Sequence, residues 1–315
     1  MKDLKRVLSL IMSFLIIFIV VGCNSKEEYK SNSKLQVRNN VQLNIVTTDK
    51  FLYNMVKSIV GNRHVVEYMF NDRKSEVDFK FTEDSVNNVS KKDLFFYVGA
   101  DYEPWVDTFV DKLNKSKVGV INVSRGINFL SYSRVVKYNN TILKDNPYYV
   151  NNIDNYRIAL MNIKNALEDR DAKNRDFYEK NFSETLNKLD SYKKDLKSVD
   201  GELSNYTFIV IEDELSYFAK YNNLKLLDVS PREDNSIIPL DSAGQKDLEQ
   251  KLKDNKVVLL YNNDAVVKSN EELIKNYNIK TSKIEIYNGD FNYEETLKHN
   301  INSLENIYKK QKFST

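Results

Sequence analysis

Residues 94–98 read Leu-Phe-Phe-Tyr-Val, an apolar run that lacks the polar alternation of a half-exposed strand. Such a run is typical of a strand that is buried on both faces, as in a parallel sheet covered by helices. Other strands are expected in the first half of the chain at 42–46, 65–69 and 118–123, with helices between them at 52–59, 84–89 and 106–113. Alternating strands and helices of this kind predict an α/β unit with a parallel sheet.

The second half repeats the alternation after a long helical stretch. A helix over 172–198 would be about 40 Å long at roughly 1.5 Å per residue. The apolar positions that should face the rest of the protein are Phe177, Phe182, Leu186, Leu189 and Tyr192. Strands are then expected at 206–211, 224–229, 256–261 and 282–287, with helices at 215–220, 247–252, 270–277 and 293–310. The predicted architecture is α/β, with two lobes, each a four-stranded parallel sheet flanked by helices, joined by one long linker helix.

The N-terminus predicts export. Basic residues Lys2, Lys5 and Arg6 precede an uncharged apolar run over 7–21, which is too short to span a bilayer comfortably. The run ends at Gly22 and Cys23, the only cysteine, and this arrangement resembles the lipobox of bacterial lipoproteins. The resemblance implies cleavage of a signal peptide, 1–22, and lipidation of Cys23.

The expected domain organisation follows from these segments. A flexible tether, 23–41, precedes an N-terminal lobe, 42–150, linker helices, 151–200, and a C-terminal lobe, 201–315. The protein is expected to be lipid-anchored on the extracellular face of the cytoplasmic membrane.

Composition excludes several classes of function. Without residues 1–22 the chain has 44 basic and 44 acidic residues, so no charge excess favours binding to nucleic acid. A lipidated Cys23 leaves no cysteine for a disulfide. The sequence has no glycine-rich phosphate loop, nucleophile elbow or His–Cys pair, and we do not expect an enzyme.

Several motifs together resemble one family. They are Ile-Val-Thr-Thr at 45–48, Asp-Leu-Phe-Phe-Tyr-Val-Gly at 93–99, Tyr-Glu-Pro-Trp at 102–105, Val-Ser-Arg-Gly-Ile at 123–127 and Ser-Pro-Arg-Glu-Asp at 230–234. The chain resembles the zinc- and manganese-type solute-binding lipoproteins of ABC importers, some of which are labelled adhesins. The resemblance implies a metal ion between two lobes, little hinge closure and an ABC permease as partner. We expect a monomer that binds a small solute or metal ion.

The resemblance also implies positions for the metal ligands. Two histidines of the family correspond to Val77 and Tyr148, the third ligand corresponds to Glu212, and the fourth to Asp290 or, by spacing, Asn288. Glu76 and Asp78 flank Val77 and are candidate pocket residues. The two histidines of the chain, His64 and His299, fall on none of these positions and are interpreted as surface residues.

A site built from Tyr148, Glu212 and Asp290 would contain only oxygen ligands. Such a set suits Mn²⁺ or another hard divalent ion better than Zn²⁺, although the sequence establishes no cofactor. Carboxylates buried together without a metal ion would hold a proton or need an Arg or Lys partner. Two functions stay open: a transport receptor with an altered site, or an adhesin-like lipoprotein that kept the scaffold and does not bind metal.

Overall fold

The first sheet is parallel and has four strands. The computed structural model describes residues 42–138, 141–231, 235–238, 242–253 and 256–309. The strand order is β2-β1-β3-β4, with bounds β1 (Asn44–Asp49), β2 (Val65–Phe70), β3 (Leu94–Tyr97) and β4 (Gly119–Asn122). Residues 94–97 pair with β1 on one side and with β4 on the other, which confirms the apolar run as an interior strand.

Helices cover both faces of this sheet. Alternate residues of β3 point to opposite sides, so Phe96 packs in the core beneath α2 while Phe95 packs against Trp105 and Phe109. The helices of this half are α2 (Lys50–Val60), α3 (Arg73–Val77), α4 (Glu83–Ser90) and α5 (Val106–Lys112). Asp49 begins α2, because its carboxylate accepts a hydrogen bond from the Phe51 amide at 2.7 Å.

The second sheet is also parallel, with three strands among the described residues. The order is β11-β10-β7, with bounds β7 (Thr207–Ile209), β10 (Val257–Tyr261) and β11 (Lys280–Lys283). The predicted fourth strand, 224–229, contributes only a parallel bridge between Leu226 and Phe208. Leu227 is buried but Leu226 is 49% exposed, so this edge segment has little apolar surface to hold a longer strand.

Helices flank the second sheet on both faces as well. Phe208 belongs to the core shared with α8 and α12, whereas Ile209 belongs to the cluster that contains residues of α9 and α10. The bounds are α8 (Ser216–Tyr221), α9 (Ser242–Lys253), α10 (Asp264–Ser269), α11 (Glu271–Tyr277) and α12 (Tyr293–Lys309).

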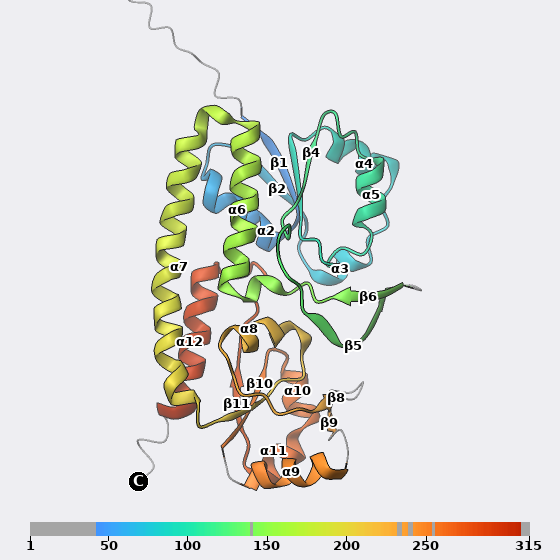
Figure 1. Cartoon of the computed structure of the whole chain (residues 1–315). Helices are drawn as coiled ribbons and strands as arrows, with labels where there is room; N and C mark the ends of the chain where they lie inside the picture. Colours follow the sequence, from blue (N-terminus) through green and yellow to red (C-terminus); the bar gives the residue numbers. More distant parts are fainter. Residues whose placement is uncertain (1–41, 139–140, 232–234, 239–241, 254–255, 310–315) are drawn as a thin grey trace, which may run out of the picture. The chain divides into compact units, whose positions relative to one another are not determined.

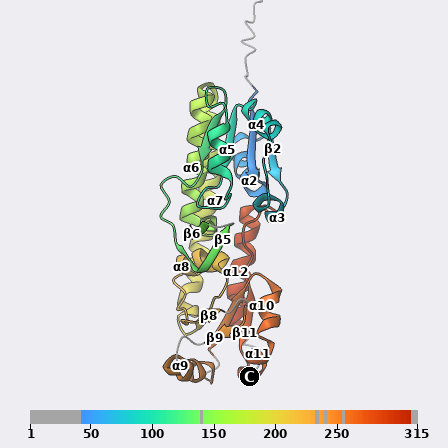
Figure 2. The same ribbon diagram turned by 90° about the vertical axis from the view of Figure 1, so that its right-hand side faces the viewer.

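Two helices connect the sheets. They are α6 (Ile153–Arg170) and α7 (Arg175–Leu203), with the short η2 (Ala172–Asn174) between them. Helix α7 packs on α2 of the first half and on α12 of the second, and both views show it running alongside both (Figures 1 and 2). The five apolar positions predicted to face inward are buried or packed against the core. The predicted α/β fold with a long linking helix is therefore confirmed.

A hairpin between the two sheets was not expected from the sequence. It consists of β5 (Ser131–Tyr138) and β6 (Thr141–Asp145), which pair antiparallel. In Figure 1 it lies beside α3, at the level between the two sheets. The remaining short elements are η1 (Tyr149–Asn151), η3 (Asp213–Leu215), β8 (Ser230–Pro231) and β9 (Ile237–Ile238).

The hairpin is fastened to both halves of the fold. The Leu130 amide donates to the Tyr217 hydroxyl at 2.7 Å, and the Ser133 amide donates to Asp213 at 2.7 Å. On the other side, the Lys144 amide donates to Asp101 at 3.2 Å. These bonds place the hairpin as one wall of the space between the sheets.

The predicted signal peptide, the tether and the lipidated Cys23 lie outside the described residues. Within the described part, no helix has the length and apolar character needed to cross a membrane.

Candidate interlobe site

A cavity of about 270 Å³ lies where the two halves meet the hairpin. Its wall brings together α3, the loop after β3, the β5–β6 hairpin, the residue before η1, and η3. The lining residues are Arg73, Val77, Pro104, Tyr132, Arg134, Val136, Lys137, Tyr138, Leu143, Tyr148, Asp213 and Glu214. Val77 and Tyr148, which hold the two histidine positions of the resemblance, thus line one cavity although 70 residues separate them.

The guanidinium of Arg73 is the central charge of this wall. It donates to the Glu76 carboxylate at 2.9 Å and lies over the Tyr102 ring with 3.7 Å to the centroid, and its charge opposes the rise that burial causes in the pKa of the Tyr148 hydroxyl. Its side chain is 32% exposed, whereas that of Glu76 is fully buried. A positive charge therefore lies against both Tyr148 and the segment that carries Val77.

Three carboxylates, those of Asp49, Glu76 and Glu103, lie behind Arg73. Glu103 accepts hydrogen bonds from the Thr48 hydroxyl at 2.5 Å and from two backbone amides, so it fastens the loop after β3 to β1. Glu76 bonds Arg73 through Oε2, but its Oε1 is buried without a hydrogen bond. Burial raises the pKa of all three, to about 7 for Asp49 and to about 9 for Glu76. The single positive charge of Arg73 cannot balance three carboxylates, so the cluster holds protons at neutral pH.

These pKa values predict that stability falls with rising pH. Between pH 7 and 9 the folded chain keeps a proton on Glu76 that the unfolded chain, with an ordinary pKa of 4.5, has lost. The folded state therefore binds more protons, and the free energy of unfolding decreases as pH rises through this range. Urea unfolding at pH 7 and pH 9 should show a smaller decrease for Glu76→Gln than for the wild type. Glu272→Gln, an exposed control, should retain the full decrease; an equal decrease for Glu76→Gln would contradict the assignment.

Glu212 faces a different set of partners. Its carboxylate accepts hydrogen bonds from the backbone amides of Asn262 at 2.8 Å and Asn263 at 3.0 Å, at the start of α10. Glu212 is buried, and burial raises its pKa. It does not belong to the cavity lining; its neighbours Asp213 and Glu214 do. Its role as a metal ligand stays a prediction.

Asp290 also lies outside the lining. Its side chain is 61% exposed and pairs with Lys50 at 2.9 Å, while the Asn288 side chain donates to it at 3.0 Å. The turn at Gly289 lies close to α2. A Cβ at this position would be only 2.7 Å from the Phe51 amide nitrogen, so a larger residue would not fit. Neither Asp290 nor Asn288 shares the cavity with Tyr148. Asp78 ends α3 and is absent from the lining too.

The surface interpretation of His64 was wrong. His64 is 5% exposed, accepts a hydrogen bond from the Leu43 amide at 3.2 Å, and bonds the Tyr178 hydroxyl at 2.5 Å. Tyr178 in turn donates to Asp171 at 2.6 Å. Both ring nitrogens thus have partners on other segments, which permits burial and lowers the pKa of His64 through desolvation. His299 is exposed, as predicted.

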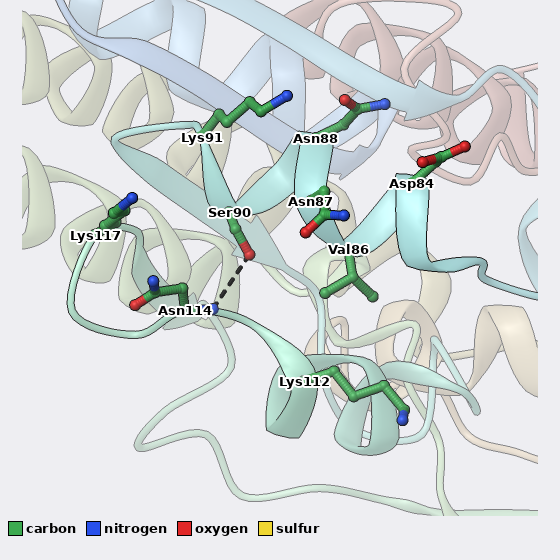
Figure 3. A pocket seen from close by; sticks show the side chains of 9 residues that line it. All are labelled: Asp84, Val86, Asn87, Asn88, Ser90, Lys91, Lys112, Asn114 and Lys117. Atoms are coloured by element: carbon green, nitrogen blue, oxygen red, sulfur yellow. Dashed lines mark hydrogen bonds between the residues drawn. The ribbon is translucent and has the colours of Figure 1, made fainter.

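A larger hollow, about 590 Å³, lies between α4 and α5 on the first half. Figure 3 shows its polar lining, in which Lys91, Lys112 and Lys117 point in different directions and the Asn114 amide donates to Ser90 at 3.1 Å. Its charged side chains do not converge on one point. The interlobe cavity, with charges that face one another, is the better candidate site.

The side chains that line the interlobe cavity do not form a zinc site with imidazole ligands. Across the described ranges, no three His, Cys, Asp or Glu side chains are grouped so that they could hold a metal ion. The cavity wall offers tyrosine and carboxylate oxygens together with two arginines, and a guanidinium repels a cation. The residues present therefore do not fit the histidine-rich site that the resemblance implied.

Comparison with known proteins identifies the family. Residues 45–307 match the family described as zinc-uptake complex component A, periplasmic. The chain belongs to this family. The manganese ABC transporter substrate-binding lipoprotein PsaA of Streptococcus mitis is 25% identical over 225 residues, 69% of each chain. The iron ABC transporter substrate-binding lipoprotein MtsA of Streptococcus pyogenes serotype M1 is 25% identical over 223 residues, 69% of this chain and 68% of that one.

Solved structures agree on the fold. The metal-dependent lipoprotein YcdH of Bacillus subtilis matches with a TM-score of 0.68 at 21% identity, over 85% of this chain and 100% of that one. The Zn(II)-bound ZnuA-like domain of AdcA from Streptococcus pneumoniae matches with a TM-score of 0.66 at 20% identity, over 85% of this chain and 99% of that one. The family recognised from the sequence motifs is confirmed.

Proposed function

We propose that this chain is the extracytoplasmic solute-binding component of an ABC importer, anchored to the membrane by lipid on Cys23. Membership of the family supports the receptor role, and the relatives named above are substrate-binding lipoproteins of metal ABC transporters. The basic residues, apolar run and single cysteine at the N-terminus support the anchor. A permease and an ATPase are the partners that this role requires.

The solute site of this receptor differs from an imidazole-ligated metal site, and Arg73 is the observation that carries this part of the proposal. Arg73 donates to Glu76, beside one expected histidine position, and lines the same cavity as Val77 and Tyr148, the residues at both positions. Its guanidinium supplies the positive charge that buried carboxylates need and that a metal ion would otherwise provide. Tyr148, Glu212 and Asp290 would have to leave their present partners to share an ion. Zinc is therefore not held tightly, and Mn²⁺ binds weakly at most.

Calorimetry with metal ions tests this proposal. Metal-stripped full-length protein in detergent is titrated with Zn²⁺ and with Mn²⁺ at neutral pH. We expect no site tighter than about 1 μM, which corresponds to roughly −8 kcal/mol. Stoichiometric zinc binding at nanomolar concentration that is lost in Glu212→Ala, but kept in the exposed control Glu272→Ala, would show that the family metal site is intact.

A further inference from the structure

The interlobe cavity is larger than a single ion requires. A metal ion held by direct ligands takes about the space of one water molecule, roughly 30 Å³. The cavity has about 270 Å³, and its walls come from both halves and the hairpin. This volume accommodates a small organic molecule.

Strand β5 gives the cavity an aromatic and charged wall. Side chains alternate along a strand, and Tyr132, Arg134, Val136 and Tyr138 occupy alternate positions that line the cavity; Lys137, near the end of the strand, lines it as well. Val135, between them, is 71% exposed. Two tyrosine rings and an arginine are thus presented from one strand toward Tyr148 and η3.

Two acidic residues of η3, Asp213 and Glu214, lie in the same lining, and Asp213 is next to Arg134. Asp213 is 3% exposed; its Oδ1 accepts the Ser133 amide, but its Oδ2 has no hydrogen bond. Among the described residues, the Glu214 carboxylate has neither a hydrogen bond nor an ion pair. A buried carboxylate oxygen without a donor is costly and favours a ligand that supplies one.

Arg134 is held only loosely. Its Nε lies 3.8 Å from Asp213 Oδ2, beyond hydrogen-bond distance, and one terminal nitrogen donates to Asn235 at 3.3 Å. Most of its donors therefore remain available to an added acceptor. The cavity thus presents acceptors and donors of opposite charge within one small space.

We propose that this cavity binds a small zwitterionic organic solute, an amino acid or a dipeptide. The solute ammonium group is recognised by Asp213 and Glu214, its carboxylate by Arg134, and its apolar part by the rings of Tyr132, Tyr138 and Tyr148. Charge-assisted hydrogen bonds at both ends, with aromatic contacts between them, give such a ligand orientation as well as affinity. The inference rests on the proposed receptor function and names the class of solute.

A ligand series tests the proposal on the full-length protein in detergent. Thermal unfolding is measured with each of the twenty L-amino acids and with a set of dipeptides, and the compound that raises the melting temperature most is titrated by calorimetry. Its methyl ester lacks the carboxylate, and its N-acetyl derivative lacks the ammonium group. We expect each derivative to bind at least about tenfold more weakly, the loss typical of one charged hydrogen bond.

Two variants test the assigned residues. Arg134→Gln and Asp213→Asn should each weaken binding of the same compound about tenfold, whereas the exposed control Arg125→Gln should not. Asp213→Asn keeps the oxygen that accepts the Ser133 amide, so the hairpin contact is preserved. If either variant fails to fold, the ester and acetyl derivatives still decide the question on the wild type.

The outcomes separate this inference from the function on which it rests. The zwitterion site is refuted if no amino acid or dipeptide binds, or if the methyl ester and the N-acetyl derivative bind as tightly as the parent compound. The receptor role stands in either case. Tight zinc binding in the metal titration would instead overturn the proposed altered site itself.

Discussion

Arg73→Met is expected to lower the free energy of unfolding by about 2 kcal/mol, because the buried Glu76 carboxyl, protonated at pH 7, loses its hydrogen-bond partner. The Arg73 side chain is one-third exposed, which limits the loss, but its partner Glu76 is fully buried and has no other cationic partner among the described residues. The variant also loses the contact with the Tyr102 ring. Urea unfolding at pH 7 gives the measurement.

A double-mutant cycle shows whether the loss comes from the contact with Glu76. In Glu76→Leu the buried carboxyl is gone, so adding Arg73→Met should cost clearly less than it does in the wild type. Arg125→Met, on an exposed arginine, should change stability by less than about 0.5 kcal/mol. An equal cost of Arg73→Met with and without Glu76 would mean that the guanidinium does not balance this carboxylate.

Restoring the imidazoles is expected to create zinc affinity. In the triple variant Arg73→Ala, Val77→His, Tyr148→His, two imidazoles replace an isopropyl group and a phenol on the cavity wall, and the competing guanidinium is removed. Zinc affinity should rise at least about a hundredfold over the wild type, since imidazole is a preferred zinc ligand. Competition with a chelating dye measures the change.

The matched control keeps the substitution of Arg73 but introduces no histidine. Arg73→Ala, Val77→Ala, Tyr148→Phe should bind zinc no more tightly than the wild type. If both triple variants bind equally, Val77 and Tyr148 do not correspond to ligand positions, and the residue-by-residue correspondence behind the site prediction fails.

The sequence predicted the fold well where burial dominates. The apolar run at 94–97 became an interior strand because both of its faces are covered, and the long helix was visible in its spaced apolar residues. The edge segment at 224–229 was predicted as a full strand but forms only a bridge, and the hairpin at 131–145 was not predicted. Few residues of either segment are buried, so specific contacts such as the bond from the Ser133 amide to Asp213 decide their structure.

The site was predicted only in part. Val77 and Tyr148 line one cavity, but Arg73 was overlooked because it stands in a polar run, Asn-Asp-Arg-Lys at 71–74, that resembles a solvated turn. One signal was available: Arg73 and Val77 are four residues apart, and a helix over this segment places them on the same face. Which of the three acids at 212–214 lines the cavity depends on the turn that follows β7, and residue types alone do not determine it.

The ion pair of Arg73 with Glu76 also constrains how this lineage can change. A variant that gained one histidine would still hold a guanidinium beside it, and one that lost the arginine first would leave the buried Glu76 carboxyl without its hydrogen-bond partner. Each single step toward a metal site therefore passes through a less stable or non-binding protein. A path that first replaces Glu76 avoids this barrier, so the order of substitutions, and not only their identity, decides whether metal binding can arise.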